Sequence, residues 1–212
     1  MARAQPSRFL KFAAVLLVAV AGPNATLGDE VLINLEWRPA PQTVFVDDPV
    51  GLGLYAVSAD SELTQLFRAL DLVFSWDPNY LQLDGLDQSG AVPLLSSGFP
   101  ANDLHGLNEV VPPADGDGYY KAWAHLGQPV VVDPAGVLLT TFLFTALAPT
   151  DATQVVMEVS GGSPVLETTV WGGPGANTNV TGTLDTGVIE IIPEPATLIL
   201  LVLGGLALPR RR

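Results

Sequence analysis

The chain of 212 residues contains no cysteine. This absence excludes disulfide bonds, thiolate-bound zinc, iron–sulfur clusters and cysteine nucleophiles. Histidine is nearly absent as well, because His105 and His125 are the only two, and a histidine-rich metal site is therefore excluded. Without cross-links, an apolar core has to hold the fold together, and a hydrophobic content of 48% suffices for one globular domain.

Basic residues are also scarce. Nine lysines and arginines stand against 22 aspartates and glutamates, which gives a net charge of −13. Nucleic acid is excluded as a partner, because a protein binds it by replacing phosphate counterions with basic side chains. Six of the nine bases lie near the two ends, and residues 29–192 hold 21 acidic and three basic residues, a net charge of −18.

Catalytic motifs are missing too, since the sequence has no G-x-S-x-G, G-x-x-x-x-G-K-[ST] or H-E-x-x-H. His105 or His125 could serve as a lone base, although a lone histidine is more often structural. Asp84 and Asp87 could form a glycosidase pair, but their spacing does not place two carboxylates across a cleft. We therefore expect a protein that is not an enzyme and has no resident cofactor.

Residues 1–28 have the pattern of a secretory signal peptide. Three basic residues (Arg3, Arg8 and Lys11) precede an apolar run at residues 12–21, which is too short to span a membrane. Cleavage is expected after Ala21 or just before Asp29. The alternative is a buried N-terminal helix. The signal peptide predicts that the mature chain leaves the cytoplasm.

The other end of the chain has a second basic and apolar pattern. A Pro-Glu-Pro tripeptide comes first, and an uncharged run of 13 residues follows at 196–208. As a helix this run is about 20 Å long, short of a hydrocarbon core of about 30 Å. Terminal arginines would stay cytoplasmic and stop its transfer. The residues concerned are Pro193, Glu194, Pro195, Arg210, Arg211 and Arg212.

These features, in this order, resemble the PEP-CTERM sorting signal of Gram-negative bacteria. The resemblance covers residues 193–212 and implies processing near the tripeptide by an exosortase, a transpeptidase-like membrane enzyme. It also implies that the mature protein lacks residues 197–208 and the terminal arginines. The expected location is the cell surface or the extracellular matrix, after export across the inner membrane and transient anchoring by the short helix. A plain tail anchor is the alternative.

Between the signal peptide and the sorting signal, residues 29–192 alternate between apolar and polar side chains, as β-strands do. The core is predicted to contain Leu72, Phe74, Trp76, Phe142 and Phe144. Residues 61–69 are the only stretch that could be helical. The further strand candidates are residues 31–37, 51–59, 70–77, 119–126, 130–132, 137–147, 155–159, 165–171 and 187–192. Glycine, proline, aspartate and asparagine separate them, so we expect an all-β, antiparallel two-sheet sandwich of eight or nine strands.

Three segments resemble the patterns of cohesin-like domains. Residues 44–52 (VFVDDPVGL) are similar to V-x-V-G-D-x-V-x-V, although Asp47 replaces the glycine. Residues 70–81 (LDLVFSWDPNYL) are similar to l-x-f-x-l-x-y-D-P-x-x-L, and residues 136–146 (GVLLTTFLFTA) to G-x-L-x-x-x-x-F-x-A. The resemblance implies a jelly roll of the cohesin and carbohydrate-binding-module type over residues 44–192.

A candidate calcium site starts at Asp115 and Asp117, because two carboxylates followed by Gly118 begin many calcium loops. An EF-hand is excluded, since Leu126 stands where a glutamate is needed, but Asp103 or Glu109 could complete another kind of site. The alternative is an acidic hairpin turn. These residues lie within a long proline-rich stretch, 84–118, which is predicted to be either a binding loop or a packed Ω-loop.

Two functions are compatible with these features. The first is an exported, non-catalytic surface or matrix protein that contacts extracellular polysaccharide or surface proteins. The second is a carbohydrate-binding or carbohydrate-processing module on the same fold. Aromatic side chains distinguish them: Tyr119, Tyr120, Trp123 and Trp171 exposed in a row would favour sugar stacking, and their burial would favour the first function.

Overall fold

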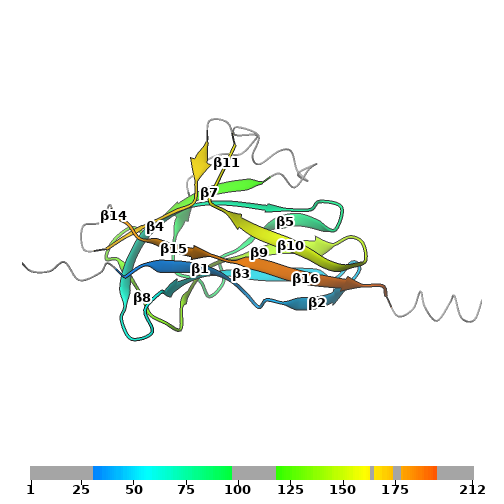
Figure 1. Ribbon diagram of the computed structural model, residues 1–212, viewed down its shortest axis with the longest axis horizontal. Helices are drawn as coiled ribbons and strands as arrows, with labels where there is room; N and C mark the ends of the chain where they lie inside the picture. The colour runs from blue at the N-terminus through cyan, green and yellow to red at the C-terminus, as the bar shows by residue number, and fades with distance from the viewer. Residues whose placement is uncertain (1–30, 97–117, 163–164, 174–177, 195–212) are drawn as a thin grey trace, which may run out of the picture.

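The computed structural model describes residues 31–96, 118–162, 165–173 and 178–194. They form a sandwich of two packed β-sheets (Figure 1). The predicted signal peptide and the short C-terminal helix lie outside these residues. Within the described part of the chain, no helix has the length and apolar character needed to cross a membrane.

The smaller sheet has five strands in the order β15-β1-β3-β9-β5. They are β1 Ile33–Arg38, β3 Pro49–Ser58, β5 Leu81–Asp87, β9 Val137–Ala146 and β15 Thr181–Leu184. The larger sheet has nine strands, of which six follow the order β14-β13-β4-β10-β16-β2. The nine are β2 Gln42–Phe45, β4 Gln65–Trp76, β6 Leu95–Ser96, β7 Tyr119–Ala124, β8 Val130–Val132, β10 Thr150–Glu158, β13 Thr169–Gly172, β14 Thr178–Asn179 and β16 Thr186–Ile192.

The long strand β4 organises the larger sheet. One edge of β4 pairs with β13 along its first half and with β10 along its second half. Its other edge pairs with β7 and β8. Two short strands, β11 Ser160–Gly161 and β12 Leu166–Glu167, pair only with each other. They form a hairpin that leaves the sheet between β10 and β13 and stands out from the sandwich (Figure 1).

The chain passes between the two sheets at several connections, and two of these connections run side by side. The chain passes from β1 to β2 and, near its other end, from β15 to β16, and at each crossing it leaves the smaller sheet for the larger one. The two segments run alongside each other in the same direction, so β1 pairs with β15, and β2 with β16, in parallel. The prediction of a wholly antiparallel sandwich is corrected at these two pairs.

The predicted core is confirmed. Leu72, Phe74, Phe142 and Phe144 are fully buried, and Trp76 is 5% exposed. The rings of Phe74 and Phe142 meet edge to face across the two sheets, with centroids 4.6 Å apart. This interface between sheets accounts for the alternation of apolar residues along β4 and β9.

Residues 61–69, the stretch that could have been helical, form no helix, because Gln65 begins strand β4. Gln65 and Phe67 are buried, and the Gln65 side-chain amide donates a hydrogen bond to the carbonyl of Val31. Only the start of the segment is non-extended, where the Asp60 carboxylate accepts hydrogen bonds from the backbone amides of Glu62 and Leu63. Burial of one face therefore overrides the helical propensity of the residues.

The long loop predicted for residues 84–118 begins later in the structure than predicted. Residues 84–87 belong to β5 on the edge of the smaller sheet, and Leu95–Ser96 forms β6. The pairing of β5 with β9 shifts register between Leu83 and Gly85. This irregularity interrupts the alternation that would identify a strand. Residues 97–117 lie outside the described part of the chain.

Candidate functional site

The candidate site lies on the outer face of the larger sheet, where the side chains point away from the core. Along β4, Leu70, Leu72 and Phe74 point inward, so the alternating residues Asp71, Val73 and Ser75 point outward. Strands β7, β10 and β13 contribute their outward residues on either side of β4. The β11–β12 hairpin rises from the middle of this face and divides it into two parts.

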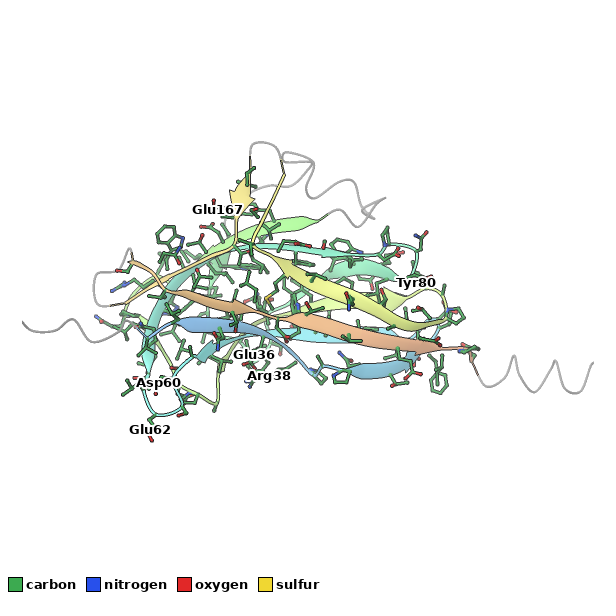
Figure 2. All side chains as sticks on the ribbon, in the orientation of Figure 1. Glu36, Arg38, Asp60, Glu62, Tyr80 and Glu167 are labelled. Atoms are coloured by element: carbon green, nitrogen blue, oxygen red, sulfur yellow. The ribbon has the colours of Figure 1, made fainter. Side chains whose placement is uncertain are left out.

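One part of this face, beside β10, is hollowed into an open depression of about 860 Å³. One lining residue, Tyr80, lies in the turn after β4, and β11 of the hairpin also lines the depression; Figure 2 labels Tyr80 and Glu167, which is on the opposite strand of the hairpin. The other lining residues are Val73, Ser75, Trp76, Asp77, Pro78, Asn79, Ala152, Thr153, Gln154, Val156, Glu158, Ser160 and Gly161.

The charge of the depression is negative. Asp77 and Glu158 are the acidic residues among its described lining residues, and none of those residues is basic. The Ser75 hydroxyl donates to Glu158 Oε1 at 2.7 Å, and the backbone amide of Asn79 donates to Asp77 Oδ1 at 2.9 Å. One oxygen of each carboxylate therefore remains available to a partner.

Thr168 fastens the hairpin to the sheet. Its hydroxyl accepts a hydrogen bond from the Val73 amide at 3.0 Å and donates to the carbonyl of Glu158. Its own amide donates to the carbonyl of Val159 at 2.9 Å, which closes the base of the hairpin. Next to this base, Val159 is 72% exposed and Val165 64% exposed. The hairpin therefore holds two apolar side chains in solvent beside the depression.

On the other side of the hairpin, two aromatic side chains share one carboxylate. Tyr120 donates its hydroxyl to Asp71 Oδ1 at 2.9 Å, and Trp171 donates its indole N–H to Asp71 Oδ2 at 2.9 Å. Burial, followed by the hydrogen bond to Asp71 and the charge of Asp71, together raise the pKa of Tyr120 to about 12. The tyrosine thus stays protonated and remains a donor to Asp71 across the physiological range.

The candidate site residues from the sequence are only partly within the described chain. Pro193 and Glu194 are exposed directly after β16. The rest lie outside: Pro195, Arg210, Arg211, Arg212, Asp115, Asp117, Asp103, Glu109 and His105. Within the residues that the structure describes, no three His, Asp or Glu side chains gather as a metal site.

The remaining candidate catalytic groups have structural partners. Asp84 and Asp87 are both exposed on the edge strand β5, and Asp84 Oδ2 accepts a hydrogen bond from Thr145 at 2.7 Å. His125 Nδ1 lies 2.9 Å from the carbonyl oxygen of Pro93. None of these three residues lines the depression.

The four aromatic residues proposed to distinguish the two functions do not form one exposed row. Trp123 is buried, with 3% exposed, and packs against Phe142 in the core. Tyr120 and Trp171 lie half-buried on the outer face, and the side chain of Tyr119 is outside the described set. Sequence reasoning missed the bridging role of Asp71, whose partners are 49 and 100 residues away along the chain.

No protein-family model matches this chain, and no curated protein does. Solved structures do. A cohesin module of a family 33 glycoside hydrolase from Clostridium perfringens superposes with a TM-score of 0.52 and 11% identity, over 77% of this chain and 99% of the other. The fold is cohesin-like.

A second cohesin-like match comes from a complex of CaCohA2, a protein of Clostridium acetobutylicum, with a CaDoc0917 variant. It has a TM-score of 0.50 and 9% identity, over 76% of this chain and 99% of the matched chain. At these identities the likeness concerns the fold. It confirms the cohesin-like sandwich predicted from the three sequence segments.

Proposed function

We propose that the chain is an exported, non-catalytic protein-binding module on a cohesin-like fold. The observation that carries the proposal is the open, acidic depression on the outer face of the larger sheet, flanked by a hairpin with exposed apolar side chains. The complex of CaCohA2 with CaDoc0917 supports it, because a related fold is used there in a two-component assembly. Residues 29–192 form the binding module in this proposal.

Charge complementarity predicts that the partner segment is basic. The depression has two carboxylates, Asp77 and Glu158, and the domain around it has a net charge of −18. A protein segment with a lysine or arginine fits beside them. Val156 and Pro78 in the floor, with Val159 and Val165 on the hairpin, would cover the apolar part of the same segment.

The ends of the chain give the module its location in this proposal. Residues 1–28 direct export, and residues 193–212 hold the chain transiently in the membrane. An exosortase recognises Pro193, Glu194 and Pro195, while Arg210, Arg211 and Arg212 stop transfer. Pro193 and Glu194 are exposed after the last strand, as a processing enzyme needs. The product is a cell-surface or matrix protein.

The binding function is tested with the mature protein from its native host, immobilised and exposed to the host's surface proteins. A partner identified by mass spectrometry should then bind in a saturable, salt-sensitive manner. Glu158→Lys should weaken that binding at least tenfold, because it places a cation against the basic segment. The control, Asp84→Lys, changes the charge equally on the other sheet and should leave binding unchanged.

Equal binding by both variants and the parent, or no saturable partner, would contradict the proposed docking site. The processing step is tested separately, by intact mass spectrometry of the same preparation. We expect a chain without residues 197–208, and replacement of Pro193, Glu194 and Pro195 by alanine should block this loss. A chain ending at Arg212 in cells with an exosortase would indicate an ordinary anchor.

Asp115 and Asp117 remain a proposed calcium site. If they bind calcium in the folded protein alone, millimolar calcium should raise the melting temperature relative to a magnesium control. The double substitution Asp115→Asn, Asp117→Asn should remove this increase. An unchanged melting temperature in the parent protein would contradict the proposed calcium site and would not affect the docking proposal.

A further inference from the structure

Tyr120, Asp71 and Trp171 form a second polar and aromatic site, separate from the depression. They lie on the part of the outer face that β7, β4 and β13 build, while the depression lies along β10 and the second half of β4. The β11–β12 hairpin stands between the two. A ligand of this second site therefore need not compete with a partner in the depression.

We propose that these three residues bind a neutral, extended polysaccharide. The strand register supports this arrangement. Trp171 lies opposite Ala69, which in turn lies opposite Ala124. Two residues further along β4, Asp71 lies between Thr169 and Ala122. Tyr120 is opposite Val73 on the far side of Asp71.

The floor between the two rings is made of small side chains. Ala69, Ala122 and Ala124 occupy the outward positions there, and an alanine rises only one carbon above the sheet. Tyr120 and Trp171 therefore stand above their neighbours at diagonal corners of a shallow platform. Such a platform fits a flat ligand, because the apolar C–H face of a pyranose stacks on an aromatic ring while its hydroxyls point sideways.

The rings are held before any ligand arrives. Each donates a 2.9 Å hydrogen bond to a different oxygen of Asp71, which fixes the direction of both side chains. Each carboxylate oxygen accepts two hydrogen bonds, so one acceptor position remains on each for a sugar hydroxyl. Ordering the rings in advance lowers the entropy lost on binding.

Spacing and charge narrow the ligand class. Strands β7 and β13 lie on opposite edges of β4, and Tyr120 and Trp171 are opposite Val73 and Ala69, four residues apart along β4. A ligand that contacts both rings therefore has to cross β4 diagonally. A domain with a net charge of −18 repels an anionic polysaccharide. A neutral polysaccharide is thus the chemistry that fits.

The test uses the full-length mature protein and cellohexaose, with an alginate hexamer as the anionic counterpart. Titration should give saturable binding of cellohexaose and none of alginate. Trp171 emission should change, because Trp37, Trp76 and Trp123 are at most 5% exposed and cannot contact the sugar. Trp171→Ala should weaken binding at least tenfold, and Trp171→Phe, which keeps a ring but loses the hydrogen bond to Asp71, should weaken it less.

The matched control is Tyr55→Ala. Tyr55 is an aromatic residue on the outer face of the smaller sheet, where it lies under the Arg38 guanidinium, and its removal should not affect sugar binding. Trp171→Phe guards against misfolding of the alanine variant, and both are checked by their melting temperatures. No binding of cellohexaose at about 10 mM, or binding that Trp171→Phe and Trp171→Ala leave unchanged, would overturn the proposal. A protein partner whose binding is lost in Tyr120→Ala but retained in Glu158→Lys would also overturn the proposal, because the platform would then be a protein-binding site.

Discussion

Asp47 has a backbone conformation that glycine adopts more readily, with a φ of 67°. It stands in the turn between β2 and β3, where its amide donates to the carbonyl of Ala146 at 2.8 Å. This is the position at which the cohesin-like pattern has glycine. The left-handed region is strained for a residue with a Cβ atom, although aspartate tolerates it better than most.

We therefore expect Asp47→Gly to stabilise the domain. Relief of the left-handed strain exceeds the extra chain entropy of glycine in the unfolded state, and the gain should be about 0.5–1 kcal/mol in the free energy of unfolding. Urea denaturation measures it. Asp48→Gly is the control and should destabilise, because Asp48 Oδ2 accepts the Phe45 amide at 3.0 Å. A loss of stability in Asp47→Gly would contradict the argument.

Tyr120 makes the stability depend on pH in the alkaline range. Its pKa is raised from 10.0 to about 12 by burial first, and then by the hydrogen bond and charge of Asp71. The folded protein therefore binds this proton more tightly than the unfolded chain does. The resulting stabilisation is complete below pH 10 and is lost as the pH rises through the window from 10 to 12.

Absorbance titration of tyrosinate checks this expectation, with Tyr120→Phe identifying the step that belongs to Tyr120. In Asp71→Asn, the pKa of Tyr120 should fall toward 10.0 without reaching it. The substitution removes the negative charge, whereas burial, the largest cause, remains. An unchanged pKa in Asp71→Asn would show that Asp71 does not act on the phenol.

Single residues differ in how far the sequence predicts them. Leu72, Phe74 and Phe142 were predictable as core residues, because burial follows from alternation within one strand. Asp71 was predictable only as outward-facing. Its bond to Trp171 depends on which strands become neighbours, and nothing within one strand specifies that.

At the scale of elements, the crossing from β15 to β16 depends on Asp185. Its carboxylate accepts the Trp37 amide at 3.1 Å and the Thr186 amide at 2.8 Å. Its own amide donates to the carbonyl of Leu35 at 3.1 Å. Asp185 thus ties the last crossing segment to β1 at the point where the chain changes sheets.

Asp185→Ala should lower the free energy of unfolding by about 2 kcal/mol, because two backbone donors lose their acceptor. Asp185→Asn keeps one acceptor oxygen and should lose roughly half as much. Chemical denaturation of both variants measures the difference. Asp151→Ala, at an exposed position on β10, is the control. Equal stabilities for Asp185→Ala and Asp151→Ala would show that the crossing does not depend on this carboxylate.

Elements with a clean alternation were predictable, and those without it were not. Residues 137–147 and 70–77 were identified as strands because both lie against the core along their length. The start of β4 resembles a helix in sequence, because residues 61–69 contain helix-forming types and only Gln65 and Phe67 are buried there. The β11–β12 hairpin and the parallel pairs have no local pattern, because they depend on contacts between distant segments.

At the scale of the whole molecule, the excess of acidic residues is uncompensated. Within the described residues, one ion pair is present, between Arg38 and Glu36 at 2.7 Å. Repulsion among the other carboxylates opposes the compact state. The charge was fully predictable from composition, but the placement of Asp77 and Glu158 in one depression was not, because it depends on the pairing of β4 with β10.

We expect sodium chloride to raise the melting temperature between about 10 mM and 0.5 M, because screening shortens the range of this repulsion. Differential scanning calorimetry measures the shift. There are two controls. One is a sucrose series of equal osmolality, and the other is the double variant Glu62→Lys, Glu167→Lys, whose melting temperature should respond less to salt. A melting temperature independent of salt in the parent protein would show that the repulsion is negligible.

The two parallel strand pairs also determine when the fold can close. β1 and β2 lie at the start of the domain, but their partners β15 and β16 are its last strands, and the bond from Trp37 to Asp185 spans 148 residues. A nascent chain emerging N-terminus first holds β1 and β2 without these neighbours until residues 181–192 appear. Because contacts between such distant segments form slowly, the sandwich stays open throughout synthesis or threading through a membrane pore. Its closure therefore waits for β15 and β16, the last two strands of the domain.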